Sequence, residues 1–151
     1  MVQPADFPTV GKPLAQKSTN DYKLQAMQRL FPFAPPGELL VAWWLMNVAK
    51  YELWKDFYFQ ASALGGRSGK GFVLDFLVVR DQPRPLDIEV QSDAFHNSAV
   101  HGEAVGILVY DKIRRQVLED NGYKVVWVSE TRLDQALDTT MRRALQGVDS
   151  M

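Results

Sequence analysis

The chain has no cysteine among its 151 residues and only two histidines. The absence of cysteine excludes disulfide bonds and thiolate metal sites and agrees with a reducing compartment. The longest apolar segment, over residues 39–49, falls short of the roughly 20 residues that span a bilayer. The N-terminus has no basic region followed by an apolar run, so we expect no signal peptide. These absences predict a soluble, cytoplasmic protein with no membrane partner.

The net charge is also small, at -1, which does not by itself indicate a nucleic-acid-binding protein. Basic residues in the second half of the chain are interleaved with acids, so a local basic surface is possible but a pervasive one is not. We expect residues 1–18, which contain three prolines and show no periodicity, to be an extended or disordered arm. Residues 19–147 should form a single domain.

The hydrophobic pattern predicts an α/β core in the order helix, three strands, helix, strand, helix. A short helix that Thr19 or Asn20 caps should precede the core. The expected core elements are a helix over 37–51, strands over 57–64, 72–79 and 86–91, a helix over 104–121 capped by Gly122, a strand over 123–128, and a helix to residue 145 with a capping box at Thr131 and Asp134. In the helix over 104–121, Tyr110, Ile113 and Val117 should form a stripe that faces the core. The expected architecture is a four-stranded mixed sheet flanked by helices.

Apolar residues surround nearly the whole circumference of the helix over 37–51. Such a helix is either central to the core or packed against a second subunit. We expect a homodimer or a higher symmetric oligomer, with Trp43, Trp44 and the segment 24–33 in the interface. The alternative is that this segment folds back over the helix and completes a monomeric core.

Two acidic residues interrupt otherwise apolar strands on either side of a short turn. Asp75 lies in the strand over 72–79 and Glu89 in the strand over 86–91, and the segment between these strands contains two prolines. If the hairpin has its midpoint at Gln82, Asp75 faces Glu89, and the two carboxylates lie side by side. A slip of one residue would send Asp75 to the opposite face of the sheet, so the prediction depends on this register.

A charge inside a buried strand is costly unless it is paired or holds a metal. Two adjacent carboxylates repel each other, which makes a divalent cation between them attractive. The paired acids therefore indicate a nuclease-like site.

The element order, with Asp75 in the second strand and Glu89-x-Gln91 in the third, resembles the PD-(D/E)XK nuclease superfamily. Lys most often stands there at the position of Gln91. Further segments look like the small branch related to very-short-patch-repair endonucleases, namely Phe95-His96, Asp111-Lys112-Ile113-Arg114, Leu118 and Gly122-Tyr123-Lys124-Val125-Val126. The likeness covers about residues 37–146 and implies a restriction-endonuclease-like core.

The resemblance also implies the metal and the attacking group. Asp75, Glu89 and the backbone carbonyl of Val90 would offer hard oxygen ligands to Mg²⁺ or Mn²⁺. Gln91 cannot supply positive charge, so its neutral amide would orient the attacking water, unless a lysine reaches into the site.

Three further residues have both a catalytic and a structural interpretation. His96 would act as general base or protonate the leaving oxygen, although a loop histidine is often a surface residue. Glu38 would ligate a second metal or hold a water, although an acid in the first turn also favours the helix dipole. Arg114 lies one helical turn from Asp111, so the two residues could form an ion pair, brace the site, or do both.

The glycine-rich segment 65–71 lacks the spacing, the Ser or Thr and the following helix of a nucleotide-binding loop, so we expect no nucleotide cofactor. It is better interpreted as a basic hairpin that touches phosphates through Arg67 and Lys70. Lys112 and Arg114 are further candidate nucleic-acid contacts.

The sequence thus predicts a divalent-metal-dependent DNA endonuclease in intracellular DNA processing, such as mobile-element, phage, restriction or repair functions. A second hypothesis is a catalytically inactive nuclease-fold subunit that binds DNA or serves assembly. An RNA-directed or structure-selective nuclease is a third.

Overall fold

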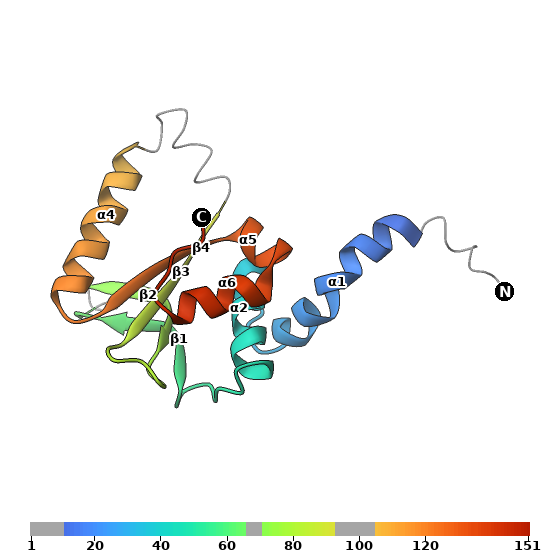
Figure 1. Ribbon diagram of the computed structural model, residues 1–151, viewed down its shortest axis with the longest axis horizontal. Helices are drawn as coiled ribbons and strands as arrows, with labels where there is room; N and C mark the ends of the chain where they lie inside the picture. The colour runs from blue at the N-terminus through green and yellow to red at the C-terminus, as the bar shows by residue number, and fades with distance from the viewer. Residues whose placement is uncertain (1–10, 66–70, 93–104) are drawn as a thin grey trace.

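The computed structural model describes residues 11–65, 71–92 and 105–151 (Figure 1). In chain order the elements are α1 (Gly11–Gln28), α2 (Pro36–Asn47), β1 (Phe57–Ala63), β2 (Phe72–Val78), β3 (Leu86–Gln91), α4 (Val105–Asp120), β4 (Lys124–Ser129), α5 (Glu130–Gln135) and α6 (Leu137–Leu145). The predicted α/β fold with a four-stranded mixed sheet flanked by helices is confirmed. Within these ranges, no helix is long and apolar enough to cross a membrane.

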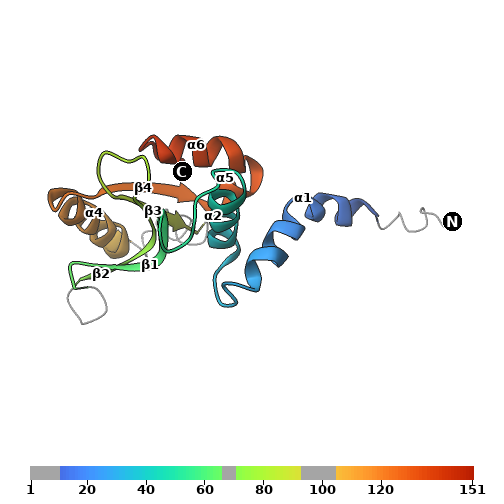
Figure 2. The same ribbon diagram turned by 90° about the horizontal axis from the view of Figure 1, so that it is seen from below.

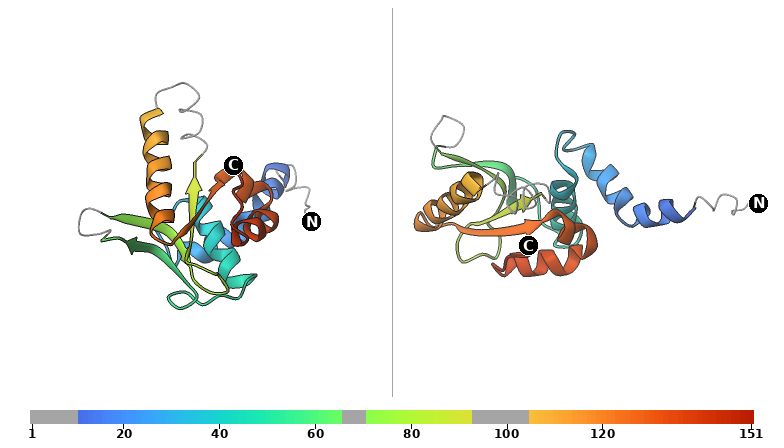
Figure 3. Two further views of the ribbon diagram at one scale, coloured as in Figure 1. Left: turned by 60° about the vertical axis from the view of Figure 1, so that its left-hand side comes forward. Right: turned by 90° about the horizontal axis from the view of Figure 1, so that it is seen from above.

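The strands lie in the order β1-β2-β3-β4. β1 pairs with β2, and β2 with β3, in antiparallel hairpins, whereas β3 and β4 are parallel. Parallel strands need a crossover connection, and α4 lies in it. Figure 3 shows α4 on one face of the sheet, with α2, α5 and α6 on the other. The sheet therefore has two differently covered faces.

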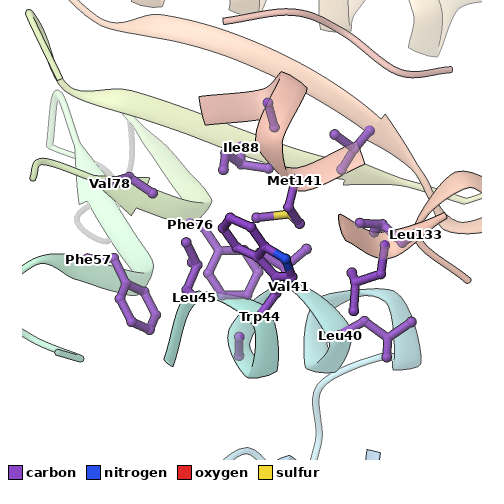
Figure 4. Packing of buried hydrophobic residues seen from close by; sticks show 14 of the residues in the cluster. Leu40, Val41, Trp44, Leu45, Phe57, Phe76, Val78, Ile88, Leu133 and Met141 are labelled. Atoms are coloured by element: carbon purple, nitrogen blue, oxygen red, sulfur yellow. The ribbon is translucent and has the colours of Figure 1, made fainter. Parts of the chain in front are cut away.

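The face beneath α2, α5 and α6 carries the main hydrophobic core (Figure 4). Leu45 of α2, Phe76 of β2, Ile88 of β3 and Met141 of α6 are fully buried there. The predicted apolar circumference of α2 is thus used within one chain, because α1, the sheet and the C-terminal helices all pack around it.

Both tryptophans of the predicted subunit interface have partners within the chain, and the predicted oligomer itself stays a prediction. Trp44 is buried, and its indole N–H donates to Asp138 Oδ1 of α6 over 3.0 Å. The ring of Trp43 meets Tyr22 of α1 edge-on, with the ring centroids 5.9 Å apart. Helix α1 packs on α2 and Met27 is buried in the main core, which is the arrangement of the monomeric alternative.

Helix α1 begins earlier than the sequence pattern indicates. Residues 11–18 are helical, so the prediction of an extended arm is wrong for them, while residues 1–10 lie outside the described ranges. Pro13 is compatible with a helix because the first turn needs no N–H from that residue. Asn20 does not cap a helix but lies within it, and its amide donates to Asp134 Oδ1 over 2.9 Å. Figure 2 shows the N-terminal part of α1 extending away from the rest of the domain.

Helix α4 is rotated relative to the prediction. Tyr110 and Ile113 are 56% and 57% exposed, and Val117 is 36% exposed, so the predicted core stripe faces solvent. The face toward the sheet instead carries Leu118 and two arginines, Arg114 and Arg115. On this face Arg114 pairs with Glu89 and bonds the carbonyl of Val73, and Arg115 bonds the carbonyl of Val125.

The last predicted helix is divided in two at Ala136, whose φ of -148° and ψ of 60° are not helical. The N-cap of α5 is Ser129, whose Oγ accepts a hydrogen bond from the N–H of Arg132 over 3.0 Å. Thr131, the predicted cap, lies inside the helix instead. At the end of α4 the predicted glycine cap is confirmed, because Gly122 has a φ of +96° and Tyr123 N–H bonds back to the carbonyl of Leu118.

Candidate active site

The hairpin of β2 and β3 has the predicted register. Its backbone pairs are Phe76↔Ile88, Leu77↔Asp87 and Val78↔Leu86, which places the midpoint at residue 82. Beyond these pairs, each carboxylate bonds the backbone of the opposite strand. The N–H of Asp75 donates to Glu89 Oε2 over 3.0 Å, and the N–H of Val90 donates to Asp75 Oδ2 over 2.9 Å. The two carboxylates therefore converge, as the sequence predicts.

Asp75 lies where β1 and β2 lose their regular pairing. The ladder contains Phe59↔Phe76 and Ala61↔Leu74 but no pair between Gln60 and Asp75. Gln60 has a φ of 55°, the left-handed region that a non-glycine residue rarely adopts. Leu74 and Phe76 consequently belong to different hydrophobic clusters, although simple alternation would put them on one face. Asp75 thus sits at a local distortion of the sheet.

Glu38, in the first turn of α2, joins the two strand acids. A Cβ on the preceding Gly37 would lie only 2.9 Å from Val90 Cγ1 and 3.1 Å from Glu130 Cγ, so a glycine is needed where α2 approaches the end of β3. The side chain of Glu38 is hydrogen-bonded to Gln60. Its Oε1 is buried with no hydrogen-bond partner in the described structure. One carboxylate oxygen of Glu38 therefore remains available to a ligand or a water.

Burial and mutual repulsion act together on these acids. Burial, followed by the charges of Glu89 and Glu38, raises the pKa of Asp75 to about 8. Burial and the charges of Glu89 and Glu130 also raise the pKa of Glu38 above its usual value. The pKa shifts show that the three carboxylates Glu38, Asp75 and Glu89 share one electrostatic environment, which is unfavourable to their combined negative charge.

Arg114 of α4 supplies positive charge to this environment. Its Nη1 lies 3.1 Å from Glu89 Oε1, and its Nη2 donates to the carbonyl of Val73 over 2.9 Å. Burial alone would lower the pKa of Arg114, but Glu89 and Asp87 raise it, so that the pKa is higher than usual. The Arg114 side chain is only 13% exposed. Arg114 therefore braces the site through Glu89 and Val73, and its role as a nucleic-acid contact stays a prediction.

A fourth acid, Asp87, lies fully buried beneath α4. Neither of its carboxylate oxygens has a hydrogen-bond donor in the described structure, and its neighbour is the carboxylate of Glu89. Burial and Glu89 raise the pKa of Asp87 well above its usual value. A proton on Asp87 would allow it to donate a hydrogen bond to Glu89.

The remaining predicted residues of this region lie at different depths. Gln91 is half-buried at the end of β3, paired with Ser129 of β4 and two residues after Glu89, which places it on the same face as Glu89. Val90 packs against the main core, and Lys112 is exposed on α4.

Asp111 is half-buried, and its pKa is raised by burial and by the charge of Glu89, although Arg114 opposes the shift. Asp111 thus belongs to the same charge network.

Three predicted residues, Arg67, Lys70 and His96, lie outside the described ranges. Within those ranges, no group of three or more histidine, aspartate or glutamate side chains is arranged to hold a metal ion. Asp75 and Glu89, with Glu38 close enough to interact with Asp75, bring carboxylate oxygens together.

Sequence reasoning missed Asp87 and Gln60 as parts of the site. The signal for Asp87 was present, since it lies two residues before Glu89 and must share its face. No local pattern marks Gln60, because its contact with Glu38 depends on the packing of α2 against the distorted edge of β1.

Chemically, the site combines a cation-attracting carboxylate pair, a buried unpartnered carboxylate oxygen and a half-buried amide. Comparison with protein-family models, with curated proteins and with solved structures finds no significant match.

Proposed function

We propose that the protein is a divalent-metal-dependent endonuclease that hydrolyses phosphodiester bonds of DNA in intracellular DNA processing. The observation that carries this proposal is the convergence of Asp75 and Glu89 across the β2–β3 hairpin, with Glu38 beside them. The resemblance of the element order and of the acidic positions to PD-(D/E)XK nucleases supports it.

The donor chemistry of the site fits a hard divalent cation. Mg²⁺ is usually held in proteins by one or two carboxylates, with waters and substrate phosphate completing the octahedron. Asp75 and Glu89 would hold Mg²⁺ or Mn²⁺, and the carbonyl of Val90 remains a predicted third ligand. When bound, such a cation stabilises negative charge that develops on a phosphodiester and activates water for attack. It would also relieve the repulsion that raises the pKa of Asp75.

The chain's own groups orient the attacking water. Gln91, on the same face as Glu89, donates or accepts a hydrogen bond through its amide and holds the water without supplying charge. Glu38 accepts a hydrogen bond at its unpartnered Oε1. Its raised pKa brings this carboxyl nearer to neutral pH, where a general base is most effective. His96 remains the predicted proton donor to the leaving oxygen.

A second function, a DNA-binding or assembly subunit without cleavage, is favoured by one observation. Arg114 already occupies Glu89 Oε1 at 3.1 Å, so a cation at Glu89 must share that oxygen with the guanidinium or displace it. The amide of Gln91 in place of the family's usual lysine points in the same direction. Both functions use the same fold, and they differ only in whether the acids bind a metal and catalyse.

Incubation with supercoiled plasmid and Mg²⁺ or Mn²⁺ separates these functions. We expect the wild-type protein to convert the plasmid to nicked or linear forms and EDTA to stop the reaction. Loss of an outer-shell partner already costs 10–100-fold in metal affinity or activity, so Asp75→Asn, which removes a ligand, should lower the rate by more than about 100-fold. Duplex and single-stranded RNA, tested in parallel, address an RNA-directed nuclease.

Asp120→Asn is the matched control, because Asp120 is an exposed acid at the end of α4 and its loss removes the same charge from the protein. It should cleave like the wild type. Cleavage by Asp75→Asn at the wild-type rate would contradict the proposed site. DNA binding without cleavage in any of the tested metals would identify the inactive subunit.

A further inference from the structure

Gln60 has a strained backbone inside a regular strand. Five of the described non-glycine residues have a positive φ, and four of them lie in the connections that follow α2, β1 and β2. Among the residues that the structure describes, only Gln60, with a φ of 55°, has this strain within a helix or strand. A glycine would adopt the same conformation without a steric cost. The chain thus keeps a long side chain at a position that disfavours one.

The strained residue lies in the same row of the sheet as the two strand acids. The β1–β2 ladder is paired on both sides of Gln60, and its register places Gln60 across from Asp75. The β2–β3 register in turn places Asp75 across from Glu89. The three residues thus form one row across three neighbouring strands. The distortion of β1 is therefore located beside the candidate active site.

The side chain of Gln60 reaches from β1 to α2, where it is hydrogen-bonded to Glu38. This bond opposes the rise that burial and the charge of Glu89 cause in the pKa of Glu38, so the amide N–H donates to the carboxylate. Oε1 of Glu38 has no partner in the described structure, so the bond goes to Oε2. One oxygen of Glu38 is therefore fixed by Gln60, and the other stays open to the site.

Glu38 is held at both ends of its side chain. At the backbone, the close approach of Gly37 to Val90 fixes the first turn of α2 against the end of β3. At the carboxylate, Gln60 supplies the hydrogen bond. The charge of Glu38 acts on Asp75, after burial and Glu89, in raising the pKa of that residue. The carboxylate that Gln60 holds is therefore close to the pair that would bind the metal.

We propose that Gln60 is a positioning residue, whose strained backbone directs its amide to Glu38 so that Oε1 of Glu38 accepts a hydrogen bond from the attacking water. This inference rests on the proposed endonuclease function and adds a residue to its site. Strained residues persist where the surrounding structure enforces them, and they are concentrated at functional sites. A group that a second residue holds in place reaches the geometry of the reaction with little loss of freedom.

Cleavage of supercoiled plasmid by full-length variants tests this role. Gln60→Gly removes the amide, so it should lower kcat about 10–100-fold and leave KM unchanged, because Glu38 acts on the water and not on the DNA. Gln60→Ala should be equally slow. The Tm of Gln60→Gly should nevertheless be about 2–4 °C above that of Gln60→Ala, because only glycine relieves the strained φ. Loss of activity is thereby separated from loss of stability.

A double-mutant cycle with Glu38→Gln distinguishes positioning from a general structural role. Glu38→Gln removes the carboxylate on which Gln60 acts, so the further change Gln60→Gly should alter kcat by less than about twofold. A residue that only supports the fold would lower kcat by the same factor in both backgrounds, because its effect would not depend on Glu38.

Lys50→Gly is the matched control, since Lys50 has a φ of 62° and lies on the exposed connection between α2 and β1. It relieves the same kind of strain and should cleave like the wild type. An unchanged kcat in Gln60→Gly, or an equal loss in both backgrounds of the cycle, would overturn the positioning role and leave the endonuclease intact. A wild type that cuts no DNA contradicts the endonuclease itself, and the positioning role is then overturned with it.

Discussion

The face of the sheet beneath α2, α5 and α6 is filled by aliphatic and aromatic side chains, whereas the face beneath α4 holds carboxylates and arginines. Adjacent residues of β3 illustrate the contrast. Ile88 and Asp87 are both fully buried, but Ile88 packs in the main core and Asp87 lies beside Glu89. Burial of Ile88 stabilises the fold, while burial of Asp87 raises its pKa and opposes its ionisation.

The face beneath α2, α5 and α6 therefore stabilises the fold, whereas the face beneath α4 destabilises it when its acids ionise. Burial of apolar area is the dominant favourable contribution to folding. Buried acids with raised pKa values lower the free energy of unfolding whenever they ionise. The main core therefore offsets the electrostatic cost of burying these acids.

Truncation on the two sides of β3 should show the contrast most strongly. Ile88→Ala should lower the free energy of unfolding by about 2–5 kcal/mol, because it removes packed methyl groups and leaves a cavity. Asp87→Asn should change it by less than about 1 kcal/mol at pH 7, because the amide keeps the shape of the side chain, avoids the cost of a buried charge, and can donate an N–H to Glu89. Urea unfolding of both variants measures the difference.

Equal destabilisation by the two substitutions would contradict the contrast between the two faces of the sheet. A large loss in Asp87→Asn that appears only above pH 7 would instead mean that Asp87 has a structural role in its ionised form.

Sequence reasoning captured the acidic hairpin because its register depends on local information. The turn with Pro83 and Pro85 fixes the midpoint, and alternation along each strand then brings Asp75 and Glu89 together. The burial of α2 was predicted as well, since a helix this apolar must be buried somewhere, but the expected interface with a second subunit did not anticipate how much of α2 packs within its own chain.

The pH dependence of stability tests the charged face next. The pKa of Asp75 is about 8 in the folded protein and near its ordinary value of 3.8 when unfolded. Between these values the folded state retains a proton that the unfolded state has lost, so the free energy of unfolding falls as the pH rises. A pKa difference of one corresponds to about 1.4 kcal/mol.

Asp75→Asn removes this contribution. Its Tm should exceed that of the wild type by about 4 °C or more at pH 8 and by less than about 1 °C at pH 4, since 1 kcal/mol shifts the Tm by about 2–4 °C at this chain length. Asp120→Asn, an exposed acid, should follow the wild-type profile. Parallel profiles for Asp75→Asn and the wild type would disprove the pKa shift.

The smallest expected effect is the response to metal. A ligand that binds only the folded state stabilises it by RT ln(1 + [L]/Kd), about 1 kcal/mol at a few times Kd. Mg²⁺ should therefore raise the Tm of the wild type by about 2–4 °C at pH 8. It should leave Asp75→Asn unchanged, and differential scanning fluorimetry measures both. The same rise in both proteins would place the cation elsewhere.

The orientation of α4 could not be read from its sequence. One side of the helix carries Tyr110, Ile113 and Val117, which a periodicity argument assigns to the core. The other side carries Arg114 and Arg115, whose partners Glu89 and Asp149 lie far away in the sequence. Periodicity weighs apolar residues and cannot include ion pairs with residues whose positions are set by the fold.

The mixed sheet has a consequence for the order of folding. The acids lie in a hairpin whose strands are joined by a short turn, whereas Arg114 belongs to the long crossover between β3 and β4. Short loops close faster and at a lower entropic cost than long ones. The carboxylates should thus meet before their guanidinium partner arrives. Their repulsion then raises the free-energy barrier to folding. Refolding should accordingly be faster near pH 4 than near pH 7, because at pH 4 a large fraction of the unfolded chains carries a protonated Asp75 when the two strands first meet.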